Sequence, residues 1–204
     1  MPIGLFIDGE YVRKAYPGAR VDYLALREFI ESELKDVVDE AYYFDADDEP
    51  PKAQKLHSFL EYPPPSGPGF RVKIYWLERK ALSWPKSMGG EPVVHPKSQK
   101  PYELTSQKAV DVGLIYHLTR SFHKRHWNKL VLGSGDADFH EPIQHLVESD
   151  NVDLHLVGTM GSISGTLRPY ARRIFEIDQE PLKSKLQLLP KNAQKKPTAG
   201  TSDL

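Results

Sequence analysis

The hydrophobic residues of this chain occur in short unbroken runs separated by longer stretches of helical spacing. Three runs, at residues 3–7, 41–44 and 130–132, have no helical period and are typical of strands buried on both faces of a parallel sheet. Residues 70–77 and 152–157 alternate apolar and polar side chains, which predicts two further strands with one wetter face.

Between these runs, apolar positions recur three and four residues apart, as on one face of a helix. The pattern predicts helices from Asp22 to Leu34, from Pro50 to Tyr62, from Thr105 or Ser106 to Lys124, and from Pro142 onward. Strands that alternate with helices indicate an α/β fold, with an open parallel sheet and helices on both faces.

The chain of 204 residues is long enough for one domain with a substantial core, which we place at residues 1–178. Its 27 Lys and Arg balance 28 Asp and Glu, so any basic surface must be local. The absence of Cys excludes disulfides and thiolate metal sites and favours a cytoplasmic protein. No apolar stretch approaches the roughly 18 residues of a membrane span. Residues 179–204 lack a packing pattern and are expected to form a disordered tail.

The stretch LVLGSGDADFHE, at 130–141, predicts a buried strand that ends in a glycine turn before a helix. Asp136 and Asp138 follow this turn, where a carboxylate can cap a helix and where open α/β sheets bind ligands. One carboxylate is enough for a cap, so the second indicates a further role. A plain helix cap is the alternative interpretation.

Two other acidic residues occupy comparable positions. Asp8 follows the first strand directly and precedes Gly9, so it is either a turn residue or a ligand at the carboxyl end of a central strand. Asp111 precedes Leu114 and Ile115 by three and four residues, so we expect it on the buried side of its helix. A buried carboxylate needs a cation, a strong partner or water, and a structural Arg or Lys is the alternative to a metal.

A parallel sheet can bring Asp8, Asp111, Asp136 and Asp138 to one end. Carboxylates so placed repel one another unless cations neutralise them, and hard oxygen ligands without Cys select Mg²⁺ or Mn²⁺. These four are therefore the candidate catalytic and metal-binding residues. The chemistry that fits is phosphodiester hydrolysis, in which a metal activates the attacking water and stabilises the leaving oxygen. We interpret the acidic run at 45–49 as capping and solvation instead.

The segment 78–104 has no hydrophobic period and contains four Pro and a Gly pair, which predicts a long irregular insertion or a small hairpin. Basic and aromatic side chains are interleaved there, which suits a phosphate backbone and stacked bases, although an ordinary solvated loop is the alternative. The candidate nucleic-acid-binding residues in and just beyond this segment are Arg79, Lys80, Trp84, Lys86, Lys97, Lys100, Tyr102 and Lys108.

The sequence GTMGSISGT, at 158–166, is a turn rich in Gly and Ser. Ser162, Ser164 or Thr166 could cap a short helix whose N-terminus attracts phosphate. Ser162 and Ser164, together with Arg168, complete the candidate nucleic-acid-binding set.

Four motifs stand out in order along the chain: FIDGEY, KAVDVGLIYHL, LGSGDADFHEPI and SGTLRPYARRIFEI. From about Ile3 to Ile177 they resemble the NYN domain family, a PIN-like nuclease family, in its LabA-like branch. The resemblance implies a PIN-like open sheet and a metal-dependent endoribonuclease with its acidic centre at the four Asp residues. Three positions depart from the family pattern. Tyr11 stands where the family usually has Asn, and His117 and Arg172 stand where it often has Asp. We interpret His117 as a packed or exposed helix residue.

The resemblance also implies a nucleic-acid partner, with RNA favoured over DNA. The apolar pattern predicts no membrane partner, and a homodimer is a further expectation. Two alternatives stay open. A catalytically inactive PIN-like module would bind RNA or a protein through the same cleft. A phosphatase of the haloacid-dehalogenase type would use Asp8 as a covalent nucleophile, but that family expects Asp where Glu10 stands.

Overall fold

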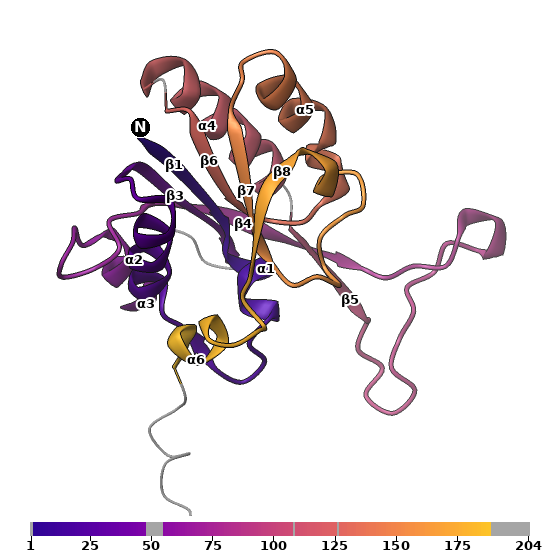
Figure 1. The fold of residues 1–204 in the computed structure, drawn as a ribbon. Helices are drawn as coiled ribbons and strands as arrows, with labels where there is room; N and C mark the ends of the chain where they lie inside the picture. Colours follow the sequence, from indigo (N-terminus) through magenta and orange to yellow (C-terminus); the bar gives the residue numbers. More distant parts are fainter. Residues whose placement is uncertain (1, 48–54, 108, 126, 189–204) are drawn as a thin grey trace, which may run out of the picture.

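A mainly parallel sheet forms the centre of the molecule (Figure 1). The computed structural model describes residues 2–47, 55–107, 109–125 and 127–188. Within these ranges, seven strands form one sheet in the order β5-β4-β3-β1-β6-β7-β8, parallel except for β5. The strands are β1 (Ile3–Asp8), β3 (Val38–Asp47), β4 (Arg71–Ala81), β5 (Glu103–Gln107), β6 (Lys129–Gly133), β7 (Asp153–Gly158) and β8 (Ala171–Glu176).

The strand order creates a crevice at one end of the sheet, outside the carboxyl ends of its central strands. Strand β1 lies between β3 and β6, with Leu5 paired to Ala41 on one side and to Val131 on the other. From β1 the chain crosses to β3, whereas from β6 it crosses to β7 in the opposite direction. Ligands bind to open α/β sheets where connections diverge in this way, outside the carboxyl ends of the strands. Asp8 ends β1 and Gly133 ends β6 at this point.

Helices cover both faces of the sheet, because the side chains of β1 are apolar in both directions. Leu5 belongs to one core with α1, α2, α3 and α6, and Phe6 belongs to the other with α4 and α5. The helices are α1 (Gly9–Lys14), α2 (Tyr23–Leu34), α3 (Lys55–Glu61), α4 (Val110–Arg125), α5 (His140–Glu148) and α6 (Leu182–Leu186). This arrangement confirms the expected α/β fold with helices on both faces. Over the described ranges, no helix is both long and apolar enough to cross a bilayer.

The segment after the last strand of the sheet is more ordered than the sequence suggests. Leu182 and Leu186 of α6 are buried against the core, and β9 (Gln187–Leu188) pairs antiparallel with β2 (Arg20–Val21). The prediction of a disordered tail is therefore wrong for residues 179–188, since two leucines four residues apart suffice to dock one turn of helix. Residues 189–204 lie outside the described residues.

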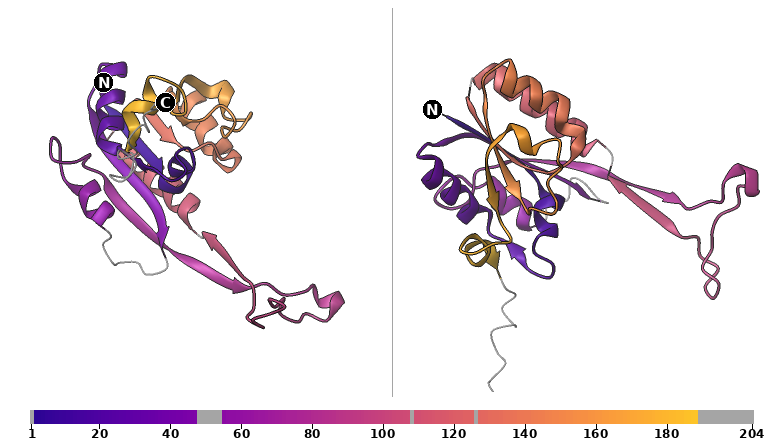
Figure 2. Two further views of the ribbon diagram at one scale, coloured as in Figure 1. Left: turned by 90° about the horizontal axis from the view of Figure 1, so that it is seen from below. Right: turned by 45° about the vertical axis from the view of Figure 1, so that its right-hand side comes forward.

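The segment 78–104 proves to be the outer part of a β-hairpin. Strand β4 continues beyond the end of β3 and pairs antiparallel with β5. Farther out, bridges between Ser83 and Pro92 and between Val94 and Pro101 each close a small hairpin. We call residues 77–107 the arm, because this ribbon projects from the body of the molecule (Figures 1 and 2). A short 3₁₀ helix, η1 (Lys86–Met88), lies near its outer end.

One predicted helix begins later than expected, and the start of another cannot be compared. Thr105 and Ser106 pair with β4, so α4 begins at Val110, because cross-strand pairing overrides the local helix pattern. Helix α3 begins at Lys55, and the predicted start at Pro50 falls outside the described residues.

Candidate active site

Side-chain alternation along β1 decides where Asp8 points. Leu5 packs toward α2 and Phe6 packs toward α4, so Asp8 lies on the α4 side of the sheet. Helix α1 begins directly after it, and Asp8 Oδ1 accepts the backbone N–H of Tyr11 at 3.0 Å. Asp8 is therefore a helix N-cap that also stands at the carboxyl end of a central strand.

Asp136 has a similar double position after β6. It is the N-cap of the 3₁₀ helix η2 (Ala137–Phe139), and its Oδ1 accepts the backbone N–H of Asp138 at 3.0 Å. Helix α5 follows, with Phe139 as an N-cap that makes no side-chain capping bond. The predicted cap is thus Asp136, acting on the turn before the helix, and the Asp138 carboxylate caps neither helix.

An open cleft of about 360 Å³ brings three of the four predicted acids together at the carboxyl edge of the sheet. Five elements contribute to it: the end of β1, helix α1, the first turn of α4, the turn after β6 and the loop after β7. Its lining residues are Asp8, Glu10, Tyr11, Lys14, Asp111, Ser134, Gly135, Asp136 and Ser162. Asp138 lies outside this lining.

The structure corrects the expectation that Asp111 is buried. Its side chain is exposed, whereas Val110, Gly113 and Leu114 are buried. The reason is that α4 starts at Val110, so Asp111 belongs to the first turn and faces the cleft instead of the core. It needs no structural Arg or Lys to offset burial.

Burial, together with neighbouring negative charge, raises the pKa values of two acids of the cleft, Asp8 and Asp111. Burial raises the pKa of Asp8 to about 6, and the charges of Asp111 and Glu10 add to the effect, while the Tyr11 N–H opposes it. Withdrawal of water by the surrounding protein raises the pKa of Asp111, and the charges of Asp136 and Asp138 raise it further. Asp138 therefore acts on the cleft through its charge. A cation would relieve this repulsion.

Tyr11 forms one wall of the cleft and closes it against the loop after β7. Its hydroxyl lies 2.6 Å from Ser162 Oγ, and the same Ser162 oxygen contacts Thr159. A Cβ at Gly135 or at Gly158 would lie 2.6 or 2.2 Å from the Tyr11 hydroxyl. These two glycines are therefore required for the close approach of the tyrosine ring.

Sequence reasoning missed the contribution of helix α1. Glu10, Tyr11 and Lys14 line the cleft, and Lys14 Nζ lies 2.7 Å from Glu10 Oε1. The sequence did hold a signal for this helix. Asp8 can act as an N-cap, and Glu10 and Lys14 are four residues apart, as on one face of a helix. A helix of six residues gives only a weak hydrophobic pattern, and the pair Asp8-Gly9 is typical of a turn.

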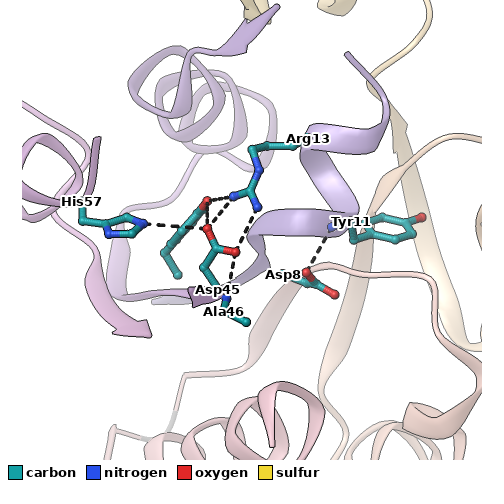
Figure 3. Close-up of polar contacts among 7 residues, drawn as sticks. Asp8, Tyr11, Arg13, Asp45, Ala46 and His57 are labelled. Carbon is teal, nitrogen blue, oxygen red and sulfur yellow. Dashed lines mark hydrogen bonds and ion pairs between the residues drawn. The ribbon is translucent and has the colours of Figure 1, made fainter. Parts of the chain in front are cut away.

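A second polar cluster lies on the other side of α1 (Figure 3). Asp45 belongs to β3 and is buried, and Arg13 of α1 donates two hydrogen bonds to it, at 2.6 and 2.9 Å. The Tyr43 hydroxyl lies 3.2 Å from Asp45, and His57 Nε2 lies 3.8 Å from it. The expectation that Asp45 serves capping and solvation is therefore wrong, because it anchors α1 to the sheet.

This anchoring cluster bears directly on the start of α1. A Cβ at Gly9 would lie 2.2 Å from the Tyr43 hydroxyl, so the cluster packs beneath the residue that follows Asp8. Any shift of the tyrosine would move the turn that carries Asp8.

The candidate nucleic-acid-binding residues fall into two regions. The arm carries Arg79, Lys80, Trp84, Lys86, Lys97, Lys100 and Tyr102, whereas Lys108 lies outside the described residues. In the loop after β7, Ser162 lines the cleft, Ser164 Oγ lies 2.8 Å from Thr166 Oγ1, and Arg168 donates to the backbone carbonyl of Ile163.

The prediction that Ser162, Ser164 or Thr166 caps a short helix in that loop is wrong. The short helix there, η3 (Arg168–Tyr170), has Leu167 as its N-cap and no side-chain capping bond.

His117 of α4 packs against Tyr42 and Phe44 at ring distances of 5.3 and 5.9 Å. It is the packed helix residue that the sequence predicted.

The donor set of the cleft suits a hard cation. Within the described residues, no three His, Asp or Glu side chains are close enough to hold one ion as they stand. Mg²⁺ is often held by only one or two carboxylates, with water and substrate phosphate as its other ligands. Asp8, Asp111 and Asp136 offer such oxygens, and two of them have raised pKa values that a cation would lower again.

Similarity to known proteins covers almost the whole described chain. The model of the NYN domain matches residues 2–178. The crystal structure of a protein of unknown function from Vibrio parahaemolyticus is similar with a TM-score of 0.62 and 20% identity, over 92% of this chain and 96% of its own. At that identity, the structural similarity supports the fold alone. No curated protein matches the chain.

Proposed function

The chain belongs to the NYN domain family, and from this premise we propose that it is a metal-dependent endoribonuclease whose active site is the acidic cleft. One observation carries the proposal: Asp8, Asp111 and Asp136, from three separate elements, converge on one open cleft at the carboxyl edge of the sheet. Acids that merely solvate a surface would be dispersed, because their mutual repulsion opposes such convergence.

In this proposal Asp8, Asp111 and Asp136 hold Mg²⁺ or Mn²⁺, and Asp138 adds negative charge from just outside the lining. When bound, the ion supplies positive charge for the phosphate and for the leaving oxygen of a phosphodiester. Without a cation the cleft would repel an RNA backbone.

The remaining lining residues orient the substrate. Lys14 stands at the rim of the cleft, where its ammonium group can contact a phosphate once it exchanges from Glu10. The Ser134 hydroxyl faces the same space and can donate a hydrogen bond to a phosphate oxygen, whereas the Ser162 hydroxyl, which donates to the Thr159 carbonyl, would first have to exchange that bond. Asp8 has a pKa of about 6 in the absence of an ion, so ion binding should release a proton from part of the molecules near that pH.

A binding-only module is the second candidate. It is favoured by the lack, within the described ranges, of a group of three acids already close enough to share an ion. The phosphatase alternative receives no support from the family assignment, and Glu10 is paired with Lys14 in the cleft.

The deciding experiment measures cleavage of labelled single-stranded RNA, structured RNA and single-stranded DNA with Mg²⁺, Mn²⁺ or EDTA. Asp136→Asn should abolish metal-dependent cleavage and leave the urea unfolding midpoint close to that of the wild type. The matched control is Asp39→Asn, which removes an exposed carboxylate near the amino end of β3, far from the cleft. Binding without cleavage in every metal would establish the binding-only module, and full activity of Asp136→Asn would overturn the assigned centre.

A further inference from the structure

The arm has two chemically different faces. Side chains alternate between the faces of a β-ribbon, and Val72 of β4 packs against the core on the side of the sheet that α2 and α3 cover. Trp76 and Lys80 continue on the face of Val72. The register pairs Lys80 with Leu104, and Tyr102 lies two residues beyond Leu104 on the same face. We call Trp76, Lys80, Tyr102 and Leu104 the arm strip.

The arm strip exposes aromatic and apolar surface beside a basic group. Trp76 is 64% exposed, Tyr102 is 45% exposed and Leu104 is 55% exposed. On the opposite face, Arg79 Nη1 lies 3.8 Å from Glu103 Oε2, so a cross-strand ion pair occupies that side of the ribbon.

Charge is also distributed unevenly between arm and body. The arm contains five Lys and Arg and three Glu, in a chain that carries 27 basic and 28 acidic residues overall. The arm is therefore basic and the remainder acidic. Such a local basic segment attracts a phosphate backbone.

The arm begins at the end of the sheet where the cleft opens, outside the carboxyl ends of the strands. Strand β4 lies two strands away from β1, about 10 Å at normal strand spacing, and runs parallel to it. The last pair between β3 and β4 joins Asp47 and Trp76, and the five strand residues beyond it reach about 17 Å farther. The Tyr75 hydroxyl packs on Gly113 of α4, next to the turn that carries Asp111. Tyr75 lies on the face of β4 opposite to the arm strip, so the arm is fixed at its base, through that other face, against the helix that supplies one acid of the cleft.

We propose that the arm strip binds a single-stranded nucleic acid and guides it toward the acidic cleft. Exposed aromatic rings stack on unpaired bases, which a duplex does not offer, and Lys80 contacts the phosphate backbone beside them. A second copy of the chain is the less suitable occupant, because Lys is depleted from protein interfaces. The inference rests on the proposed function in one respect, namely that the bound strand is the strand to be cut.

The test measures binding in EDTA, so that cleavage plays no part. Fluorescence anisotropy is recorded with labelled single-stranded RNA of about 4 to 16 nucleotides, and with a duplex of the same sequence. Tyr102→Ala should weaken binding of the longest single strand about tenfold. Tyr102→Phe, which keeps the ring, should bind like the wild type, and the duplex should bind more weakly than the single strand.

Substitutions at two neighbouring residues, Lys80 and Arg79, provide a matched control. Each substitution removes one positive charge, but from opposite faces of the ribbon. Lys80→Gln should weaken binding and reduce the slope of log affinity against log salt by about 0.7. Arg79→Gln should leave the salt slope unchanged, since Arg79 lies on the opposite face beside Glu103. Equal losses for the two variants, or no loss for Tyr102→Ala, would overturn the proposal.

Two further results separate this inference from its rivals. If Tyr102→Ala dissociates a dimer in sedimentation velocity and leaves RNA affinity intact, the arm strip is a self-association surface and the proposal fails. If the wild type binds single strands through the arm strip but cuts none with Mg²⁺ or Mn²⁺, the proposed nuclease activity fails and the arm inference stands. If the wild type cuts long substrates and the arm variants cut them equally well, the arm inference fails and the nuclease activity stands.

Discussion

Asp8→Asn should make the ion-free protein more stable at neutral pH. In the folded state burial is the main reason that the pKa of Asp8 rises from its ordinary value of 3.8 to about 6. The charged carboxylate therefore destabilises the fold above that pH. Asn removes the charge but keeps the N-cap to the Tyr11 N–H, because Asn caps helices about as well as Asp.

The magnitude follows from the pKa difference. A shift of about two units corresponds to about 3 kcal/mol, and partial access of solvent to Asp8 reduces the expected gain to about 1 to 2 kcal/mol. The sign depends on pH. Below about pH 4, Asp8 is protonated in both the folded and the unfolded chain, so the two proteins should be equally stable. The advantage of Asp8→Asn should grow between pH 4 and pH 6 and stay constant above it.

Urea unfolding in EDTA, at several pH values from 4.5 to 8, measures this difference. Asp22→Asn is the matched control, because Asp22 caps α2 through the Ala25 N–H in the same way, away from the cleft. It should change the free energy of unfolding by less than about 0.5 kcal/mol. A stability of Asp8→Asn equal to or below that of the wild type at pH 7.5 would refute the reasoning, and so would an advantage that does not vary with pH.

Three further predictions concern metal, the anchoring cluster and the turn before α4. Mn²⁺ at 100 times its dissociation constant should stabilise the wild type by about 2.7 kcal/mol and Asp8→Asn by much less, as thermal unfolding with and without the ion would show. Arg13→Met should cost about 2 to 4 kcal/mol in urea unfolding because it leaves the buried Asp45 carboxylate without its cation, and adding Asp45→Asn should restore part of the loss. Ala109 has a φ of +68°, so Ala109→Gly should stabilise the protein by about 0.5 to 1 kcal/mol, whereas Ala25→Gly inside α2 should destabilise it by about 1 kcal/mol. No gain for Ala109→Gly would mean that its backbone is relaxed.

Local pattern determined most of the fold. The apolar runs before Asp8 and before Gly133 predicted buried strands, and the helical spacing after Asp22 predicted an amphipathic helix, as the structure has them. The prediction that Asp8 and Asp136 lie at the same end of the sheet agrees with the structure, since the carboxyl ends of parallel strands lie together. The sequence alone thus led to the α/β sheet and to three of the acids that line the cleft.

Long-range contacts decided the rest. Asp111 faces the cleft because pairing between β4 and β5 delays the start of α4, and no local pattern reports that pairing. Asp45 is buried because Arg13, more than thirty residues earlier, reaches it from α1. Tyr11 closes the cleft only because two glycines, far along the chain, leave room for its ring. Periodicity records which side chains can be buried, whereas only the folded chain determines which of them meet, because those contacts join segments that the sequence holds far apart.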